Sequence, residues 1–291
     1  MAFTPIFGSA PKLLAVGSGK IAYEVGRAAG TQKAVAVVLP GMGDLRQSYR
    51  FLGPKLVAHG VTTIAVDLRG TGESSTDFQD FGIAAIASDV IAILDAEGIT
   101  QPAVIMGNSY TAAVAVYLAG THPERVAAIV GLSGFYRPMP ADTYFRPMSH
   151  VLFTTLYGTT VWVGYFKGLF KASPLPADMP EYIAAVKKIM SAEPIHAVII
   201  GKYGRESKAP AWEAADLVNC PSLILLGSQD PDFGDQAAEL ETVRSKLAGN
   251  GQPKTAVTAA LVPGTGHYPH AEDPEFVFKS IAAFFAAHAI A

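Results

Sequence analysis

Residues 103–114 read Ala-Val-Ile-Met-Gly-Asn-Ser-Tyr-Thr-Ala-Ala-Val, and the interpretation of the whole chain starts from them. The apolar, partly β-branched residues before Gly107 predict a buried strand, and the alanine-rich residues after Ser109 predict a helix. A serine between a buried strand and a helix lies on a tight turn that needs small neighbours, because the two backbones approach closely there. Such a turn exposes the hydroxyl and directs the free N–H groups of the helix toward whatever binds beside it. Ser109 is therefore the candidate nucleophile.

The segment Gly107-x-Ser109-x-Thr111 resembles the nucleophile elbow of the α/β-hydrolase family, written G-x-S-x-G. The chain departs from that pattern at Thr111, which replaces the last glycine, so we expect helix and strand to sit slightly further apart. A serine here can also simply cap a core helix. The other catalytic parts must therefore be found elsewhere in the chain.

The composition is typical of an α/β protein whose central strands are buried on both faces. Of the 291 residues, 50% are hydrophobic and 16% are charged. The net charge of −3 offers no basic field for a nucleic acid. Cys220 is the only cysteine, which excludes a disulfide framework and a cysteine metal cluster.

Neither an export signal nor a membrane span is indicated. Residues 1–10 lack a basic start followed by a sustained apolar run. The uncharged stretch at 147–166 is interrupted by polar residues, so we interpret it as part of a lid. We expect a cytoplasmic protein without stable membrane insertion, and the sequence leaves open whether it forms a homodimer.

Strand and helix patterns alternate on either side of a central interruption. Apolar runs predict strands at 12–17, 20–26, 34–39, 62–66, 103–107, 127–132, 222–226 and 255–262. Helical periodicity predicts helices at 48–59, 81–97, 110–119, 236–247 and 274–288. This alternation predicts a parallel sheet covered on both faces, with an antiparallel hairpin formed by the first two strands at its edge.

The alternation stops between residues 135 and 219. This section carries aromatics, prolines and helix-period segments at 160–170, 180–189 and 193–203, without strand runs. We predict an α/β-hydrolase core of residues 1–134 and 220–291, with residues 135–219 inserted as a helical cap. The resemblance implies a mostly parallel eight-stranded sheet with helices on both faces.

A serine needs a base, and the base needs an orienting acid. His267 lies in a glycine-bearing loop after the last predicted strand, and loops at the carboxyl ends of parallel strands open on one side of a sheet. His270 is the nearest rival and is interpreted as a packing residue. Asp230 follows the strand at 222–226 and is the predicted acid, with Asp232 as the alternative. The order serine, aspartate, histidine matches the family order.

Acyl transfer also needs N–H donors for the developing oxyanion. One predicted donor is the backbone N–H of Tyr110, directly after the nucleophile. The second is the N–H of Met42, in Pro40-Gly41-Met42-Gly43, which resembles the family's H-G-x-x turn with proline in place of histidine. The segment Asp67-x-Arg69-Gly70-x-Gly72-x-Ser74 also resembles a family signature, and we assign it a structural role in fixing a loop beside the elbow.

These parts predict a serine hydrolase that cleaves carboxylic esters of small to medium apolar acyl or aryl groups through an acyl-enzyme. Relatives that open epoxides or remove halides use a carboxylate at the elbow, which discounts both activities. Aromatic residues make the cap apolar, and five are predicted to line the substrate pocket: Phe135, Tyr136, Phe153, Trp162 and Phe166.

Three alternatives stay open on the sequence. A cofactor-free perhydrolase and a carbon–carbon bond hydrolase would use the same triad, and a small-molecule receptor on a hydrolase scaffold would retain it. We expect no cofactor and no metal, because His267 and His270 could form a chelating pair but have no further ligands nearby.

Overall fold

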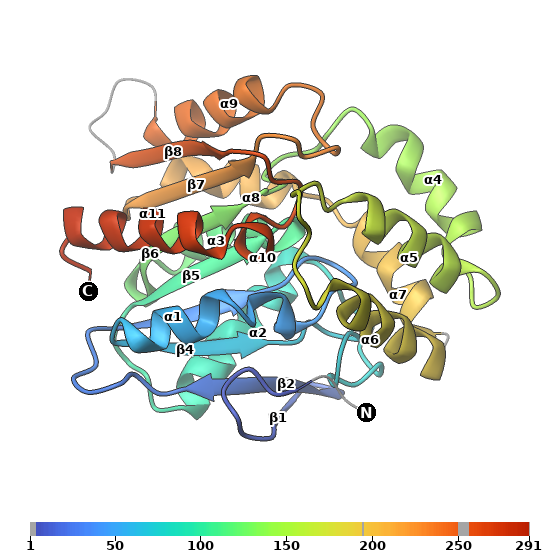
Figure 1. Cartoon of the computed structure of the whole chain (residues 1–291), viewed down its shortest axis with the longest axis horizontal. Helices are drawn as coiled ribbons and strands as arrows, with labels where there is room; N and C mark the ends of the chain where they lie inside the picture. Colours follow the sequence, from blue (N-terminus) through green and yellow to red (C-terminus); the bar gives the residue numbers. More distant parts are fainter. Residues whose placement is uncertain (1–3, 194, 250–255, 291) are drawn as a thin grey trace.

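The computed structural model describes residues 4–193, 195–249 and 256–290. Within these ranges eight strands form one sheet in the order β1-β2-β4-β3-β5-β6-β7-β8 (Figure 1). The strands are β1 (Lys12–Val16), β2 (Gly19–Gly26), β3 (Ala34–Leu39), β4 (Val61–Val66), β5 (Ala103–Asn108), β6 (Val126–Leu132), β7 (Ser222–Gly227) and β8 (Val257–Val262). The β1–β2 and β2–β4 pairs are antiparallel and the others are parallel, which confirms the predicted fold class and edge hairpin. The predicted last strand began at residue 255, which lies outside the described residues.

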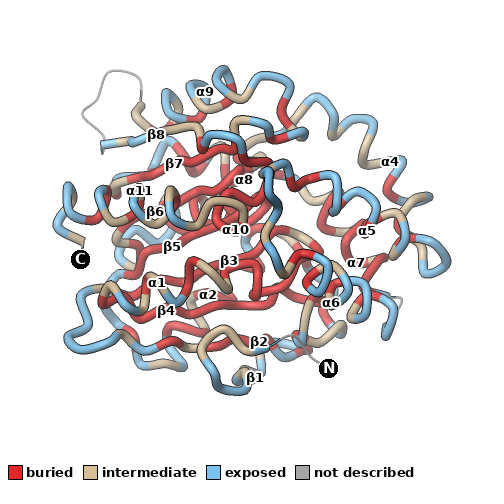
Figure 2. The backbone as a smooth tube through the Cα atoms, in the orientation of Figure 1, coloured by how far each residue is buried: buried red, intermediate tan, exposed pale blue. Residues whose placement is uncertain are grey.

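Helices cover both faces of the sheet, which explains why the central strands are continuous apolar runs. Val38, from one face of β3, belongs to the core formed with α1 (Leu52–Ala58) and α11 (Pro274–Ala287). Val37, from the opposite face, belongs to the core formed with α2 (Ile83–Ala96), α3 (Tyr110–Thr121) and α9 (Gln236–Ala248). Figure 2 shows the buried strands at the centre and exposed residues along the outer sides of the helices.

The strand register brings four loops to the same edge of the sheet. Leu39, the last residue of β3, pairs with Gly107, and Leu132, the last residue of β6, pairs with Asn108. Leu132 also pairs with Leu225, near the end of β7. The turns after β3, β5, β6 and β7 therefore begin side by side at the carboxyl ends of these strands, which is where open α/β sheets bind ligands.

Five α-helices lie between β6 and β7 in the described part of the chain. They are α4 (Asp142–Leu152), α5 (Gly158–Gly168), α6 (Met179–Ala192), α7 (Ile195–Arg205) and α8 (Ala209–Ala214). Helices α4–α7 gather at one end of the sheet (Figure 1). The segments predicted at 160–170, 180–189 and 193–203 correspond to α5, α6 and α7, whereas α4 and α8 had no counterpart in the predictions.

Helix α8 packs on the core although the sequence assigned it to the cap. Ala211 of α8, with Ala215 and Val218 just after it, belongs to the same buried cluster as the alanines of α3. Gly120 of α3 lies so close that an added Cβ would come within 2.4 Å of the Ala214 carbonyl oxygen. We therefore propose that the cap ends near residue 208 rather than at 219.

Polar contacts connect the cap to the loops at the carboxyl ends of the strands. Trp162 of α5 donates its indole N–H to the Gly43 carbonyl oxygen at 3.0 Å. Tyr203 of α7 donates its hydroxyl to the Arg69 carbonyl oxygen at 2.8 Å. These contacts hold α5 and α7 against the loops that follow β3 and β4. Among the described helices, none has both the length and the apolar character needed to cross a membrane.

Candidate active site

Ser109 lies at the junction of β5 and α3 with φ 58° and ψ −124°, a left-handed conformation that is strained for a residue with a Cβ. Its N–H donates to the Leu132 carbonyl oxygen at 3.0 Å, and its carbonyl oxygen accepts from Phe135 N–H at 3.1 Å. A Cβ on Gly107 would lie 2.2 Å from the Thr111 carbonyl oxygen, so only glycine is accommodated there. The neighbouring strand thus holds the strained turn that presents the hydroxyl.

Thr111 uses its hydroxyl where the family pattern has a glycine. The Oγ1 atom lies 2.9 Å from the Leu39 carbonyl oxygen, 3.0 Å from that of Pro40 and 2.8 Å from that of Asn108. Thr111 is fully buried, so these contacts connect the start of α3 to the end of β3 without water. The expected wider spacing of helix and strand stays a prediction.

Replacing Thr111 by valine should lower the free energy of unfolding by about 1–3 kcal/mol, because the buried carbonyl oxygen that accepts its single hydroxyl hydrogen loses that donor. Urea denaturation measures the change. Thr121→Val, which removes a hydroxyl bonded to the Tyr117 carbonyl at the exposed end of α3, is the control and should cost less than about 0.5 kcal/mol. Equal losses in the two variants would contradict the role given to Thr111.

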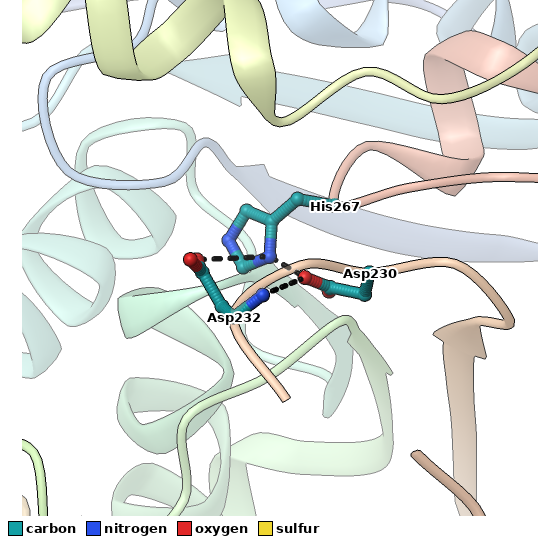
Figure 3. Close-up of side chains that lie close together, drawn as sticks. All are labelled: Asp230, Asp232 and His267. Carbon is teal, nitrogen blue, oxygen red and sulfur yellow. Dashed lines mark hydrogen bonds and ion pairs between the residues drawn. The ribbon is translucent and has the colours of Figure 1, made fainter. Parts of the chain in front are cut away.

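His267 and Asp230 meet from loops that follow neighbouring strands, β8 and β7. Their Nδ1 and Oδ2 atoms are 2.8 Å apart, and both side chains are buried (Figure 3). The Asp232 carboxylate lies 3.5 Å from the same nitrogen, beyond hydrogen-bond distance. Asp230 is thus the hydrogen-bond partner of the imidazole. Since the short contact requires a proton on Nδ1, Nε2 is the ring nitrogen that can accept one.

Asn108 links the histidine loop to the elbow. Its side-chain amide donates to the carbonyl oxygens of Leu132 and His267, at 3.0 Å each. Phe135, whose N–H binds the Ser109 carbonyl, has its ring centroid 5.8 Å from that of the imidazole. The sequence analysis missed Asn108, although an amide at the end of a buried strand was an available signal.

The pKa of His267 reflects two opposing effects. Burial lowers it, but the charges of Asp230, Asp232 and Glu272 and the hydrogen bond that His267 donates to Asp230 outweigh burial and raise it to about 9. His270 behaves in the opposite way. It is fully buried, stacks on Tyr49 at 4.5 Å between ring centroids, and burial lowers its pKa to about 3. A neutral histidine packed in this way has the properties of a core residue.

A cavity of about 600 Å³ opens beside Ser109, between the core and the cap. Phe135, Phe153 and Trp162 line it, together with Met42, Tyr110 and Asp232. The predicted pocket residues Tyr136 and Phe166 do not line it. The Tyr136 ring packs against Gly131 and Gly134 in the core. The fully buried Phe166 instead packs with Phe170, with Tyr182 of α6 and with Tyr268.

The turn after β3 lies directly against the candidate nucleophile. A Cβ added to Gly41 would be 3.1 Å from Ser109 Cβ and 3.7 Å from its Oγ. Among the described residues, the backbone N–H groups of Met42 and Tyr110 have no hydrogen-bond acceptor. Met42 and Tyr110 both line the cavity next to Ser109, and the role of their N–H groups as oxyanion donors stays a prediction.

The segment Asp67-x-Arg69-Gly70-x-Gly72-x-Ser74 forms ion pairs with residues outside itself. Asp67 binds the guanidinium and the N–H of Arg46, and Arg69 binds both carboxylate oxygens of Asp89 at 2.6 and 2.7 Å. A Cβ on Gly72 would lie 2.2 Å from the Asp67 carboxyl group. These buried contacts fix the loop, as expected of a structural segment.

The side chains of Asp230, Asp232 and His267 each offer an atom within 4.8 Å of the others, an arrangement that a metal ion can use (Figure 3). The imidazole nitrogen in this group is Nδ1, whose proton is held by Asp230. A metal would have to displace that proton, so these residues are better suited to hydrogen bonding than to metal binding.

Activity should accordingly be unchanged, within about twofold, after dialysis against EDTA or 1,10-phenanthroline, because no step assigned to these residues needs a Lewis acid. Ester turnover and total metal analysis of the same sample provide the check. A loss of activity that zinc restores would contradict the assignment.

Comparison with known proteins places the chain in a family. Residues 36–280 match the model of the alpha/beta hydrolase family. Epoxide hydrolase B of Mycobacterium tuberculosis is 35% identical over 104 residues, so the match spans 35% of this chain and only 29% of that protein. The 2-heptyl-3-hydroxy-4-quinolone dioxygenase AqdC1 of Rhodococcus erythropolis is 28% identical over 91% of both chains. A thermophilic esterase from Thermogutta terrifontis has the same fold, with a TM-score of 0.78 and 20% identity over 96% of this chain and 99% of that one. The chain belongs to the alpha/beta hydrolase family.

Proposed function

We propose that the chain is a serine hydrolase that cleaves carboxylic esters with small to medium apolar acyl or aryl groups. The observation that carries the proposal is the 2.8 Å contact between His267 and Asp230. Asn108, the residue before Ser109, holds the loop of that histidine by a hydrogen bond to the His267 carbonyl oxygen. An imidazole oriented by a buried carboxylate is the base that a serine hydroxyl needs. The esterase from Thermogutta terrifontis shares this fold at 20% sequence identity, so the fold is compatible with ester hydrolysis.

In the proposed reaction, Ser109 Oγ attacks the ester carbonyl while His267 Nε2 accepts the hydroxyl proton. The N–H groups of Met42 and Tyr110 donate to the oxyanion of the tetrahedral intermediate. His267 then returns the proton to the leaving alkoxide, which frees the alcohol and leaves an acyl group on Ser109. A water molecule, deprotonated by His267, attacks the acyl-enzyme, and His267 returns that proton to Ser109 Oγ as the acyl–oxygen bond breaks and the acid leaves.

The residue at the elbow separates this reaction from epoxide opening. An epoxide hydrolase is among the relatives of this chain, and it matches about a third of its length. Opening an epoxide through an alkyl–enzyme ester needs a carboxylate nucleophile, and Ser109 supplies a hydroxyl instead. Acyl transfer is therefore the reaction that we propose.

A panel of p-nitrophenyl esters from acetate to dodecanoate tests the proposal. Because the cavity is about 600 Å³ and mostly apolar in its lining, kcat/KM should be highest at intermediate chain lengths. Treatment with an organophosphate should add one adduct, on the peptide that carries Ser109. Folded protein that turns over no ester and forms no adduct would end the proposal.

The pH dependence follows from the state of His267, which must be neutral to accept a proton. Since its pKa is raised to about 9, kcat/KM should increase with pH up to that value and level off above it. Asp232→Asn removes a nearby negative charge, so it should lower the pKa of His267 and move the increase to lower pH. Initial rates from pH 5 to 10 measure both curves. A shift of the Asp232→Asn curve to higher pH would contradict the assignment.

A dioxygenase is the second candidate, favoured by the match to AqdC1 over 91% of both chains. In such a reaction His267 would be the base, and the Ser109 hydroxyl would not be needed as a nucleophile. Oxygen uptake with 2-heptyl-3-hydroxy-4-quinolone, and no added cofactor, tests this candidate. Uptake that persists in Ser109→Ala would favour it over the esterase, and its absence in the wild type would exclude that substrate.

A further inference from the structure

Lys208 is a buried cation in the wall of the cavity that contains Ser109. The residue is 6% exposed, and its ammonium lies 3.3 Å from each carboxylate oxygen of Asp142, which also lines the cavity. Charge-assisted hydrogen bonds are usually roughly 2.7–2.9 Å long, so both contacts are weak. An ammonium has three N–H donors, and Asp142 does not saturate them.

Stability does not explain a lysine at this position. Lys208 immediately precedes α8, at a helix N-terminus, where the helix dipole disfavours a cation. Burial lowers the pKa of Lys208, which means that the charged form is disfavoured there. Asp142, in contrast, begins α4 and accepts Met139 N–H at 2.9 Å, a favourable place for a carboxylate. The carboxylate has a structural reason to be there and the ammonium does not.

Phe135 lies near both this lysine and the candidate base. Its ring centroid is 5.8 Å from the Lys208 ammonium and 5.8 Å from the centroid of the His267 imidazole. The two groups are therefore no more than about 12 Å apart, which an extended chain of about ten bonds covers. A single substrate can contact both.

We propose that Lys208 binds an uncharged acceptor oxygen, such as a ketone, on the part of the ester substrate remote from the scissile carbonyl. This inference rests on the proposed ester hydrolysis. An uncharged acceptor is favoured over a carboxylate because Asp142 and Asp232 both line the described cavity wall, so an anionic substrate would meet two carboxylates and one ammonium there. The aromatic lining between the ends suits an apolar chain, so the substrate class is a keto ester.

Matched pairs of p-nitrophenyl esters test the proposal. Each pair consists of a plain ester and the same ester with one ketone in its acyl chain. The first pairs are heptanoates with the ketone at carbon 4, 5 or 6, and longer acyl chains extend the series to a ketone at carbon 9. In the wild type one ketone position should raise kcat/KM about tenfold over the plain ester, the lower end for a hydrogen bond to a charged group. The p-nitrophenyl monoester of pimelic acid, which ends in a carboxylate, should react more slowly than the heptanoate.

Lys208→Met should reduce the ketone-to-plain ratio to about one, and the ratio cancels any general loss of active protein. Lys246→Met is the matched control, because that ammonium lies 5.2 Å from the Trp212 ring centroid and pairs with Asp216 away from the cavity. It should keep the tenfold ratio.

The proposal is overturned if no ketone position raises kcat/KM in the wild type, or if Lys208→Met keeps the wild-type ratio of keto ester to plain ester. It is also overturned if the wild type hydrolyses the pimelate faster than the heptanoate, because Lys208 would then bind an anionic group rather than a ketone. Should Lys208→Met not fold, the wild-type series alone decides. In all of these outcomes plain esters are hydrolysed, whereas failure of the proposed function would leave every ester intact.

Discussion

Ser109→Ala should lower kcat for p-nitrophenyl butyrate by at least about 10⁴-fold, because the acyl-enzyme can no longer form and only binding and oxyanion stabilisation remain. The strained turn should tolerate the change, since alanine keeps the Cβ and the backbone hydrogen bonds of this position do not involve the hydroxyl. Steady-state kinetics and circular dichroism on the same preparation measure activity and folding.

Ser133→Ala is the matched control for this experiment. Ser133 also has a positive φ, 45°, and is fully buried at the end of the neighbouring strand β6. Its hydroxyl accepts from Gly227 N–H at 3.3 Å. The control should keep kcat within about threefold, because Ser133 has no partner in the proposed chemistry. Similar rates in Ser109→Ala and the wild type would show that Ser109 is not the nucleophile and would support a receptor.

Asp230→Asn should lower kcat by about 10³–10⁴-fold, while Asp232→Asn should lower it by less than about tenfold. The reason is geometric: Asp230 Oδ2 accepts the Nδ1 proton at 2.8 Å, whereas Asp232 lies 3.5 Å away. An asparagine at 230 can turn its amide toward Nδ1 and move the proton to Nε2, the nitrogen that must accept the serine proton.

The two variants have the same change of charge within two residues of each other, so their difference isolates the hydrogen bond. Asp232 instead accepts from the Tyr165 hydroxyl at 2.7 Å, a contact with the cap. Equal losses would mean that both carboxylates orient the imidazole. A larger loss in Asp232→Asn would transfer the orienting role to that residue.

The central strands could be read from the sequence because β3, β4, β5 and β7 are apolar runs buried on both faces, as the core positions of Val37 and Val38 illustrate. Helices α4 and α8 could not be predicted from the sequence. Pro147 stands inside α4 and reads locally as a helix breaker, and α8 is only six residues long with Pro210 in its first turn. Both form because surrounding residues bury one side of the helix, a contribution that local propensity does not include.

Only some of the residues that line the cavity could be predicted from the sequence. The aromatic content of 135–219 indicated an apolar cap, and Phe135, Phe153 and Trp162 line the cavity. Tyr136 and Phe166 instead pack in the interior, because side-chain direction depends on the packing of each helix and not on composition. Lys208 gave no signal in the sequence as a cavity residue, since its burial arises from segments distant in the chain.

The sequence by itself determined the fold, the position of the elbow and the loops that carry the candidate base and acid. These features depend on periodicity and on glycine, which act over a few neighbouring residues. The tertiary structure alone decided that Asp230 rather than Asp232 contacts His267, that Asn108 joins the two loops, and which residues surround the cavity. Those outcomes depend on distances between residues far apart in the chain, which strand register and helix packing set.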